Sequence, residues 1–381
     1  MDILSLSIGA PNGDAKWWRI SNISNQLQNY GHNVHHVCYG DESLGTKKGL
    51  DELERNSTDV TIIDSSLTAA SIRNVFHENI VENYDCIYGN NHVSTLFGNL
   101  RIFDDVPVIY DIHGDILQEH LLKYESNPQL PNRFSLKSGS KLLTKWVIYK
   151  SNLSASSAIL SVSKKMKRKL QDDGIPKSKI SYITNGVDLD FFSQENSQHQ
   201  PLKEELGLSS ELIVGYVGGF QEWQGVQSLI SAAKQIDDDE IIFLIVGKRQ
   251  GVDDNIRFVP RIPRESVPDY YSVCDILVLP RPHHVATEVA APTKFAEYAA
   301  MGKPILATNV GDAANLIRQY ECGVVIENNS AERITEGIAE LQSLSQSERK
   351  KMGENSRKMA ISEFNWEKIG KSLSDTLSKL V

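Results

Sequence analysis

The sequence predicts an α/β protein of two doubly wound domains, each with a mostly parallel sheet between layers of helices. Short apolar runs alternate with helical segments from residue 2 onward. The same alternation starts again near residue 212, after a polar stretch without periodicity. The length of 381 residues also suits two domains of roughly 150–200 residues better than one hydrophobic core.

The composition argues against several classes of protein. A net charge of −9 is unsuited to a general nucleic-acid binder, whose affinity depends on neutralising phosphates. The four cysteines lie far apart, which favours neither a zinc site nor a disulfide framework. The chain starts directly with a strand, so no signal peptide is expected, and no apolar run approaches the ~20 residues of a membrane span. The reduced cytoplasm is the expected location.

The first half begins with a strand over residues 2–8, a turn-rich loop over 9–16 and a helix over 17–30 that ends at Gly31. His35 and His36 stand on the second strand and are interpreted as half-buried strand residues rather than metal ligands. The other strands of this half are expected at 34–38, 61–63, 85–88, 108–112, 158–163 and 180–183.

His113 follows the fifth of these strands. It belongs to a His-Gly-Asp sequence at the carboxyl end of the strand, the edge where open α/β sheets bind ligands. A neutral imidazole at this edge can hydrogen-bond a ligand hydroxyl or stabilise developing charge. The alternative is a structural histidine that caps the strand end.

A strongly basic stretch lies over residues 133–169. Between residues 126 and 171 the chain has ten lysines or arginines and neither aspartate nor glutamate. Apolar residues, Trp146 among them, interleave with these lysines over 136–150, which predicts a basic amphipathic helix. Such a face suits an anionic membrane surface or a phosphorylated lipid acceptor. The alternative is a solvated face above a buried apolar stripe.

Domain boundaries follow from composition and from turn signals. An Asn-Gly-Val-Asp turn at 185–188 closes the first half, and a polar stretch without helical periodicity follows. We expect a first domain over 1–192, a linker over 193–208, a second domain over 209–358 and a C-terminal helix over 359–381.

The second domain opens with a strand over 212–217 that leads into Gly218 and Gly219. Two glycines let the backbone approach a phosphate closely, and the N-terminus of a helix expected over 220–236 would favour the same anion. Further strands are expected at 241–247, 275–279, 305–307 and 322–326, and the loop over 281–291 is expected to line a ligand pocket.

A helix over 292–301 carries the most informative residues. Pro292 suits the start of a helix, and Gly302 ends it. Lys294 and Glu297 are three residues apart and share a face. The first N–H groups and the Lys294 ammonium attract an anion, while the Glu297 carboxylate can accept two hydrogen bonds from a ribose diol. This pattern indicates a nucleotide; the alternative is an ordinary exposed Lys–Glu pair.

The order Pro-Thr-Lys-Phe-Ala-Glu-Tyr-Ala-Ala-Met-Gly-Lys-Pro over 292–304 resembles the donor-site signature of retaining glycosyltransferases of family 4, in the branch with Pro-x-Lys-x-x-Glu-Tyr. The resemblance implies the GT-B fold, two Rossmann-like domains facing each other across a cleft, with the C-terminal helix packing back on the first domain. It also implies a hexosyltransferase that uses a nucleotide diphosphate sugar as co-substrate, with no bound cofactor and no fixed metal. The acceptor would be a hydroxyl of a glycan or lipid-linked molecule in cell-surface polysaccharide or glycoconjugate synthesis.

The resemblance also assigns roles to residues. Lys294 would stabilise the leaving diphosphate, while His113 and Glu288 would position the sugar. The family places its first glutamate at the position of Val289, one residue later. The implied donor-binding residues are Gly13, Gly218, Gly219, Arg261, Ile262, Arg281, Thr293, Lys294, Phe295 and Glu297.

The sequence departs from the family at two positions. Many members carry an arginine at the position of Phe220 and a lysine at the position of Gln224, so Lys294 and Arg281 would carry more of the charge here. This departure keeps one rival open, a catalytically weak sugar-nucleotide-binding subunit. A second rival is a sugar-nucleotide epimerase or phosphorylase on the same fold. His283 and the adjacent His284 are interpreted as pocket residues rather than metal ligands.

Overall fold

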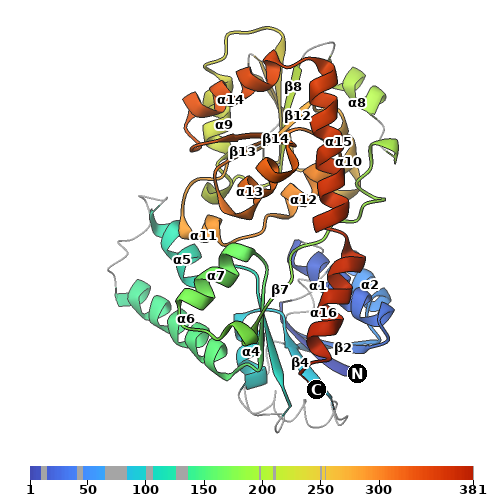
Figure 1. Ribbon diagram of the computed structural model, residues 1–381, viewed down its shortest axis with the longest axis vertical. Helices are drawn as coiled ribbons and strands as arrows, with labels where there is room; N and C mark the ends of the chain where they lie inside the picture. The colour runs from blue at the N-terminus through green and yellow to red at the C-terminus, as the bar shows by residue number, and fades with distance from the viewer. Residues whose placement is uncertain are drawn as a thin grey trace. The chain divides into compact units, whose positions relative to one another are not determined.

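The computed structural model describes residues 1–9, 15–40, 46–64, 84–99, 106–125, 136–196, 199–208, 212–248, 251–253 and 255–380. The chain forms two compact units (Figure 1). The first comprises Met1–Tyr124, Pro128–Thr184 and Trp366–Val381, and the second consists mainly of Asn185–Asn365. Each unit contains a seven-stranded sheet flanked by helices, as the α/β prediction requires.

The sheet of the first unit is parallel, with the strand order β3-β2-β1-β4-β5-β6-β7. Ile3 and Leu4 are neighbours in β1 and both are fully buried, which shows that both faces of the sheet are covered. The strands are β1 Asp2–Ile8, β2 Asn33–Gly40, β3 Asp59–Asp64, β4 Cys86–Gly89, β5 Val108–Ile112, β6 Ala158–Ser161 and β7 Ile180–Tyr182.

Helices from both ends of the chain cover the first sheet. Trp18 of α1 packs edge-on against Trp366 of α16, with ring centroids 5.6 Å apart, so the last helix completes the core of this unit. Helix α4 packs on α6 and on the central strands. The helices are α1 Ala15–Asn29, α2 Lys47–Arg55, α4 His92–Asn99, α5 Ile116–Glu125, α6 Leu136–Ala155, α7 Lys164–Asp172, the short η2 Lys177–Lys179 and α16 Trp366–Leu377.

The sheet of the second unit has the order β10-β11-β9-β8-β12-β13-β14, and β10 pairs antiparallel with β11 whereas the other pairs are parallel. Almost every strand residue is apolar, as expected of strands buried on both faces. The strands are β8 Leu212–Val217, β9 Ile241–Val246, β10 Gly251–Asp253, β11 Ile256–Val259, β12 Ile276–Leu279, β13 Ile305–Thr308 and β14 Gly323–Ile326.

The second unit has two apolar cores, one on each face of its sheet, and each core has its own set of helices. Helices α9 and α14 pack on one face of the sheet, and α10, α12, α13 and α15 pack on the other. The helices are η3 Gln194–Asn196, α8 His199–Glu205, η4 Glu222–Gln224, α9 Val226–Ala233, η5 Arg264–Ser266, α10 Val267–Ser272, α11 Val285–Glu288, α12 Thr293–Ala300, α13 Gly311–Tyr320, α14 Ala331–Ser343 and α15 Gln346–Glu363.

The unit boundaries differ from the predicted domain boundaries at 192 and 359. Residues 185–192 belong to the second unit, because Arg357 of α15 donates hydrogen bonds to the carbonyls of Leu189 and Phe192 at 2.9 Å each. Phe192 is fully buried in the core of that unit. The C-terminal region forms two helices, of which α15 buries Met359 in the second unit, and the chain returns to the first unit only at Trp366.

The helix predicted over 220–236 begins later than expected. The short η4 comes first, and α9 begins only at Val226. Gly225 separates the two with a φ of 71°, and a Cβ at this position would lie 1.6 Å from the carbonyl oxygen of Pro280. The glycine turn at 218–219 therefore does not run directly into a helix N-terminus.

Candidate functional site

Helix α12 has nearly the predicted bounds. It begins after Pro292, which has φ −70° and ψ 125°, and Gly302 follows its end with a φ of 62°. The first N–H groups of a helix have no partner within the helix, so those of Thr293 and Lys294 favour an anion. The ring of Phe295, a residue predicted to bind the donor, is buried in the core, 5.6 Å from the ring of Phe364. This buried face fixes the helix on the unit.

The Lys294 side chain reaches from α12 to the end of β8. Its Nζ donates to the hydroxyl of Tyr216 at 2.8 Å and to the amide oxygen Oε1 of Gln224 at 2.9 Å. It also lies 4.3 Å from the centroid of the Tyr216 ring, within the range of a cation–π interaction. Gln224 is therefore in contact with the lysine, although it brings no charge of its own.

The glycine turn lies directly against this lysine. A Cβ on Gly218 would lie 2.4 Å from Lys294 Nζ, a distance at which the side chain must move. The turn is held by the Gly218 N–H, which donates to Val246 at 2.9 Å, and by the Tyr216 hydroxyl, which donates to the Gly219 carbonyl at 2.6 Å. The structure thus brings the predicted residues Gly218, Gly219 and Lys294 together.

The pKa of Lys294 is unusually low for a lysine. Burial and the nearby Arg281 guanidinium lower the pKa of Lys294 to about 7, against the opposing effect of Glu297. Arg281 is itself buried, and its Nε donates to the carbonyl of Trp223 at 3.3 Å. An added anion would favour the charged ammonium, because opposite charges stabilise one another most where water is scarce.

Glu297 lies one turn further along α12 and is buried. Its Oε2 accepts a hydrogen bond from Tyr271 at 2.8 Å, and its Oε1 lies 3.7 Å from Nη1 of Arg264. Arg261, a predicted donor-binding residue, is exposed, and Arg264 lies beside Glu297. Ile262 packs partly buried against the core.

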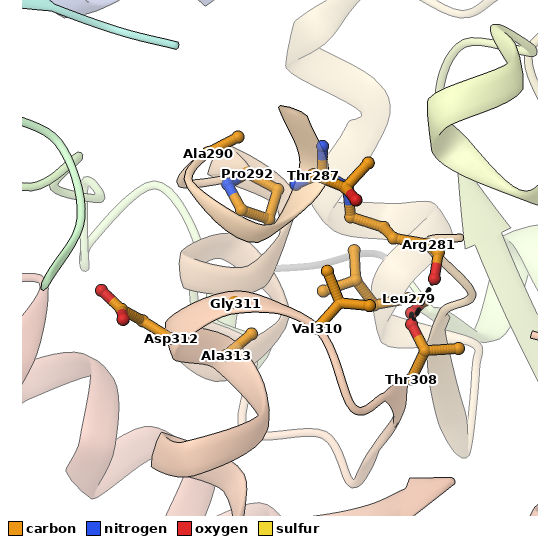
Figure 2. Close-up of a pocket in the computed structure, with 10 residues that line it drawn as sticks. All are labelled: Leu279, Arg281, Thr287, Ala290, Pro292, Thr308, Val310, Gly311, Asp312 and Ala313. Atoms are coloured by element: carbon orange, nitrogen blue, oxygen red, sulfur yellow. Dashed lines mark hydrogen bonds between the residues drawn. The ribbon is translucent and has the colours of Figure 1, made fainter. Parts of the chain in front are cut away.

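A small hollow lies between α12, the start of α13 and the end of β12. Figure 2 shows Arg281, Thr287, Val310 and Pro292 around it, and the dashed line marks the hydrogen bond from Thr308 Oγ1 to the Arg281 carbonyl. The residues that line it are Leu279, Arg281, Thr287, Ala290, Pro292, Thr308, Val310, Gly311, Asp312 and Ala313.

Glu288 is held beside this hollow. Its Oε2 accepts from the Gly311 N–H at 3.0 Å, at the N-terminus of α13, and its Oε1 lies 3.4 Å from His283 Nδ1. The neighbouring Val289 is buried, so the carboxylate of this segment comes from position 288. Glu288 is therefore fixed by a helix N-terminus and an imidazole.

His113 lies in the first unit, at the end of β5. Its Nε2 is 3.0 Å from Asp111 Oδ2, and Asp111 also accepts from Arg19 and from the hydroxyl of Tyr88. Burial alone would raise the pKa of Asp111, but Arg19 and His113 lower it overall. A carboxylate can only accept, so a neutral His113 carries its proton on Nε2 and leaves Nδ1 as an acceptor. The N–H groups of Gly13 and its loop lie outside the described residues.

The predicted amphipathic helix is α6. Leu143, Trp146 and Val147 stand at positions i, i+3 and i+4 and are 61%, 48% and 48% exposed, so they form one apolar patch. Lys141 and Lys150 are exposed on the same helix. Tyr149 and Leu153, further along the helix, are buried. Arg133 lies outside the described residues.

Two features are absent from the part of the chain that the structure describes. None of the helices in those ranges has the length and apolar character needed to cross a membrane. The same ranges hold no cluster of three or more His, Cys, Asp or Glu side chains placed to bind a metal ion. His283 contacts Glu288 and the carbonyl of Glu327. Asp188, in the turn that closes the first half of the chain, accepts hydrogen bonds from N–H groups of its own turn.

Sequence reasoning missed Asp111, Tyr216, Arg264 and Tyr271. A signal existed for Asp111, because it is a charged residue inside an otherwise apolar strand, and such a residue requires a partner. Tyr216 and Tyr271 resemble ordinary core aromatics in the sequence. Their roles depend on contacts with residues 78 and 26 positions away.

Two family models match the chain. The one described as "Glycosyltransferase Family 4" matches residues 18–191, and the one described as "Glycosyl transferases group 1" matches residues 199–359. Together they account for most of both units.

Curated relatives match at low identity. A GDP-mannose-dependent alpha-(1-6)-phosphatidylinositol monomannoside mannosyltransferase from Mycobacterium tuberculosis is 23% identical over 53% of this chain and 56% of its own length. The capsular polysaccharide biosynthesis glycosyltransferase CapM from Staphylococcus aureus is 24% identical over 63% of this chain and 67% of its own length. The chain thus spans little more than half of the length of relatives such as the mannosyltransferase.

Solved structures match over the whole chain. HepE from Anabaena in complex with UDP has a TM-score of 0.76 at 17% identity, with 100% of each chain covered. WaaG, a glycosyltransferase involved in lipopolysaccharide biosynthesis, has a TM-score of 0.70 at 15% identity, with 99% of each chain covered. These likenesses establish the GT-B fold.

Proposed function

Because this chain belongs to the group 1 glycosyl transferases, we propose that it moves a hexose from a nucleotide diphosphate sugar to a hydroxyl of a glycan or lipid-linked acceptor, with retention at the anomeric carbon. One observation carries the proposal. The Lys294 ammonium lies between the N-terminus of α12 and the Gly218–Gly219 turn, where a cation, helix N–H groups and an open backbone converge.

The leaving diphosphate occupies this convergence. The ammonium of Lys294, the N–H groups of Thr293 and Lys294 and the charge of Arg281 stabilise it as the bond to the sugar breaks. Preorganised donors of this kind contribute roughly 2.7–4 kcal/mol each. The acceptor hydroxyl attacks the face that the diphosphate leaves and passes its proton to an oxygen of the departing diphosphate, so no protein nucleophile is required. The resemblance also implies no bound cofactor and no fixed metal.

The remaining groups hold the rest of the donor. Glu297 accepts from the ribose through Oε1, since Tyr271 already occupies Oε2. The backbone of Arg261 and Ile262 faces the base, and Phe295 acts only as the anchor of α12. Glu288 accepts hydrogen bonds from sugar hydroxyls. For His113 of the first unit, which has Nδ1 as an acceptor, and for Gly13, the roles that the resemblance implies stay predictions.

The names of similar proteins support the substrate classes. HepE was crystallised with UDP and glucose, and with UDP-glucose, which supports a nucleotide sugar as donor. CapM is named for capsular polysaccharide biosynthesis, and the mycobacterial relative for a phosphatidylinositol mannoside, which support a glycan or lipid-linked acceptor in cell-surface synthesis.

We also propose that α6 contacts an anionic membrane at the cytoplasmic face. Leu143, Trp146 and Val147 insert among the headgroups while Lys141 and Lys150 attract the anionic lipids. Co-sedimentation with vesicles of phosphatidylglycerol and phosphatidylcholine tests this: binding lost in Trp146→Ser supports it. Equal binding of the native chain to vesicles of phosphatidylcholine alone contradicts it.

Thermal unfolding with UDP, GDP, ADP and their sugar conjugates tests the donor site. A ligand at about 100 times its Kd adds roughly 2.7 kcal/mol of stability. We expect one nucleotide to stabilise the native chain and to have no effect on Lys294→Ala or Glu297→Ala. Slow hydrolysis of the matching nucleotide sugar separates the transferase from a catalytically weak binding subunit, and epimerised donor would indicate an epimerase.

A further inference from the structure

Tyr216 joins two parts of the proposed diphosphate site. It is fully buried at the end of β8, and its hydroxyl donates to the Gly219 carbonyl at 2.6 Å. With its proton committed to that carbonyl, the hydroxyl oxygen presents its lone pairs to Lys294 Nζ at 2.8 Å. One side chain therefore fixes the glycine turn and the ammonium in relation to each other.

Gln224 holds the same ammonium from a different element. Its Oε1 accepts from Lys294 Nζ at 2.9 Å, and Gly225, which follows it, is held tightly against the Pro280 carbonyl. An amide oxygen orients an ammonium without neutralising it. A carboxylate at this position would instead repel a diphosphate.

The lysine has little freedom between these partners. Gly218 leaves just enough room, because a Cβ there would lie 2.4 Å from Nζ and 2.7 Å from Cε. The ammonium is thus held over the open backbone of the turn by two neutral oxygens. A cation oriented in this way before the ligand arrives loses little conformational entropy on binding.

We propose that Tyr216 and Gln224 are positioning residues, which hold the Lys294 ammonium against the Gly218–Gly219 turn so that it keeps both neutral oxygens and meets the diphosphate oxygens in a fixed orientation when the donor binds. This inference rests on the proposed function. Neither residue touches the reacting atoms, and both act through Lys294.

This arrangement makes the binding of a diphosphate depend on the protonation of Lys294. Within the described part of the chain, the charged groups that act on Lys294 are Arg281, which lowers its pKa, and Glu297, which raises it. With burial, the pKa lies at about 7, so the free ammonium loses its proton above that pH. The diphosphate binds the charged form, and affinity therefore falls at high pH, by up to about tenfold per pH unit.

Removing either neutral oxygen shifts this pH dependence. A hydrogen bond to the charged form of a group favours that form, so its loss lowers the pKa of Lys294 further. The pH at which diphosphate affinity begins to fall then moves to lower values. A residue that merely supports the fold would weaken binding at every pH without moving this midpoint.

Isothermal titration calorimetry of the full chain between pH 6 and 9 tests the proposal, with inorganic pyrophosphate and the nucleoside diphosphate that stabilises the native chain. The variants are Tyr216→Phe, which keeps the ring, and Gln224→Met, at a half-buried position. Gln227→Met, at an exposed position of α9, is the matched control. Thermal unfolding in parallel shows that each variant is folded.

We expect Tyr216→Phe and Gln224→Met each to raise the Kd about tenfold at pH 8, with the midpoint displaced to lower pH, and the control to match the native chain. If a folded variant at either position keeps native affinity and the native midpoint, the inference is overturned while the donor site stands. If the native chain binds none of pyrophosphate, UDP, GDP and ADP, the proposed function fails as well.

Discussion

Replacing Gly218 by alanine should remove the Lys294 ammonium from its place at a modest cost in stability. The added Cβ would lie 2.4 Å from Nζ and 2.7 Å from Cε, both at the far end of a flexible side chain, so the lysine moves rather than the backbone. The φ of +148° is one that residues with a Cβ rarely adopt, and this strain costs about 1–3 kcal/mol. Loss of a charged hydrogen-bond donor costs about 1.5–3 kcal/mol of binding, which is roughly 10–150-fold in Kd.

Calorimetric titration with the stabilising nucleoside diphosphate measures this loss. Gly251→Ala is the matched control, because Gly251 has a φ of +149° and its added Cβ would meet no described atom within 4 Å. Both variants carry the same backbone strain, but only the first displaces the lysine. If Gly218→Ala binds the diphosphate as tightly as Gly251→Ala does, Lys294 does not carry the charge of the leaving group.

Three further results are expected. Gly225→Ala should destabilise the second unit by at least ~2 kcal/mol in urea unfolding, because its φ is +71° and the Cβ would lie 1.6 Å from a backbone oxygen. Burial lowers the pKa of both His36 and His92 from 6.5 to about 3, so between pH 6.5 and 3 the unfolded chain binds more protons than the folded chain. The free energy of unfolding should therefore decrease as the pH falls, by up to ~1.4 kcal/mol per pH unit for each histidine. Chemical unfolding at pH 7 and 5 should show a smaller decrease in His36→Gln than in the native chain. Asp111→Asn removes the carboxylate that neutralises the buried Arg19 guanidinium and should cost about 3–5 kcal/mol in the same assay, and an unchanged stability would contradict the ion pair.

Local signals predicted much of the second unit. The start of α12 after Pro292 and its end at Gly302 depend on the chemistry of those residues alone, and the structure places both nearly as expected. The break before α9 is different, because it depends on the close approach of Gly225 to Pro280, 55 residues later in the chain. No residue near Gly225 in the sequence indicates that Pro280 comes so close to it. The contacts that join residues 185–192 to the second unit are likewise distant in sequence, since Arg357 contacts that segment.

Sequence alone predicted those site residues whose own side chain or backbone has a specific chemical use. Lys294, Glu297 and the two glycines were named because an ammonium, a carboxylate and an open backbone have specific uses wherever they occur. Their partners were not, because Tyr216 and Tyr271 become important only where folding brings their hydroxyls to Lys294 and Glu297. Contacts over such sequence distances are a property of the fold.

The pairing of α1 with α16 bears on the order in which the chain acquires its structure during synthesis. The second unit is nearly continuous in sequence, from Asn185 to Asn365, whereas the first needs Trp366, Ile369 and Leu373 to close its core. A ribosome that has made the first 184 residues has therefore not yet supplied the helix that covers their apolar surface. Residues 1–184 are translated before the second unit but complete their core only after it, and until then their apolar surface is open to chaperones.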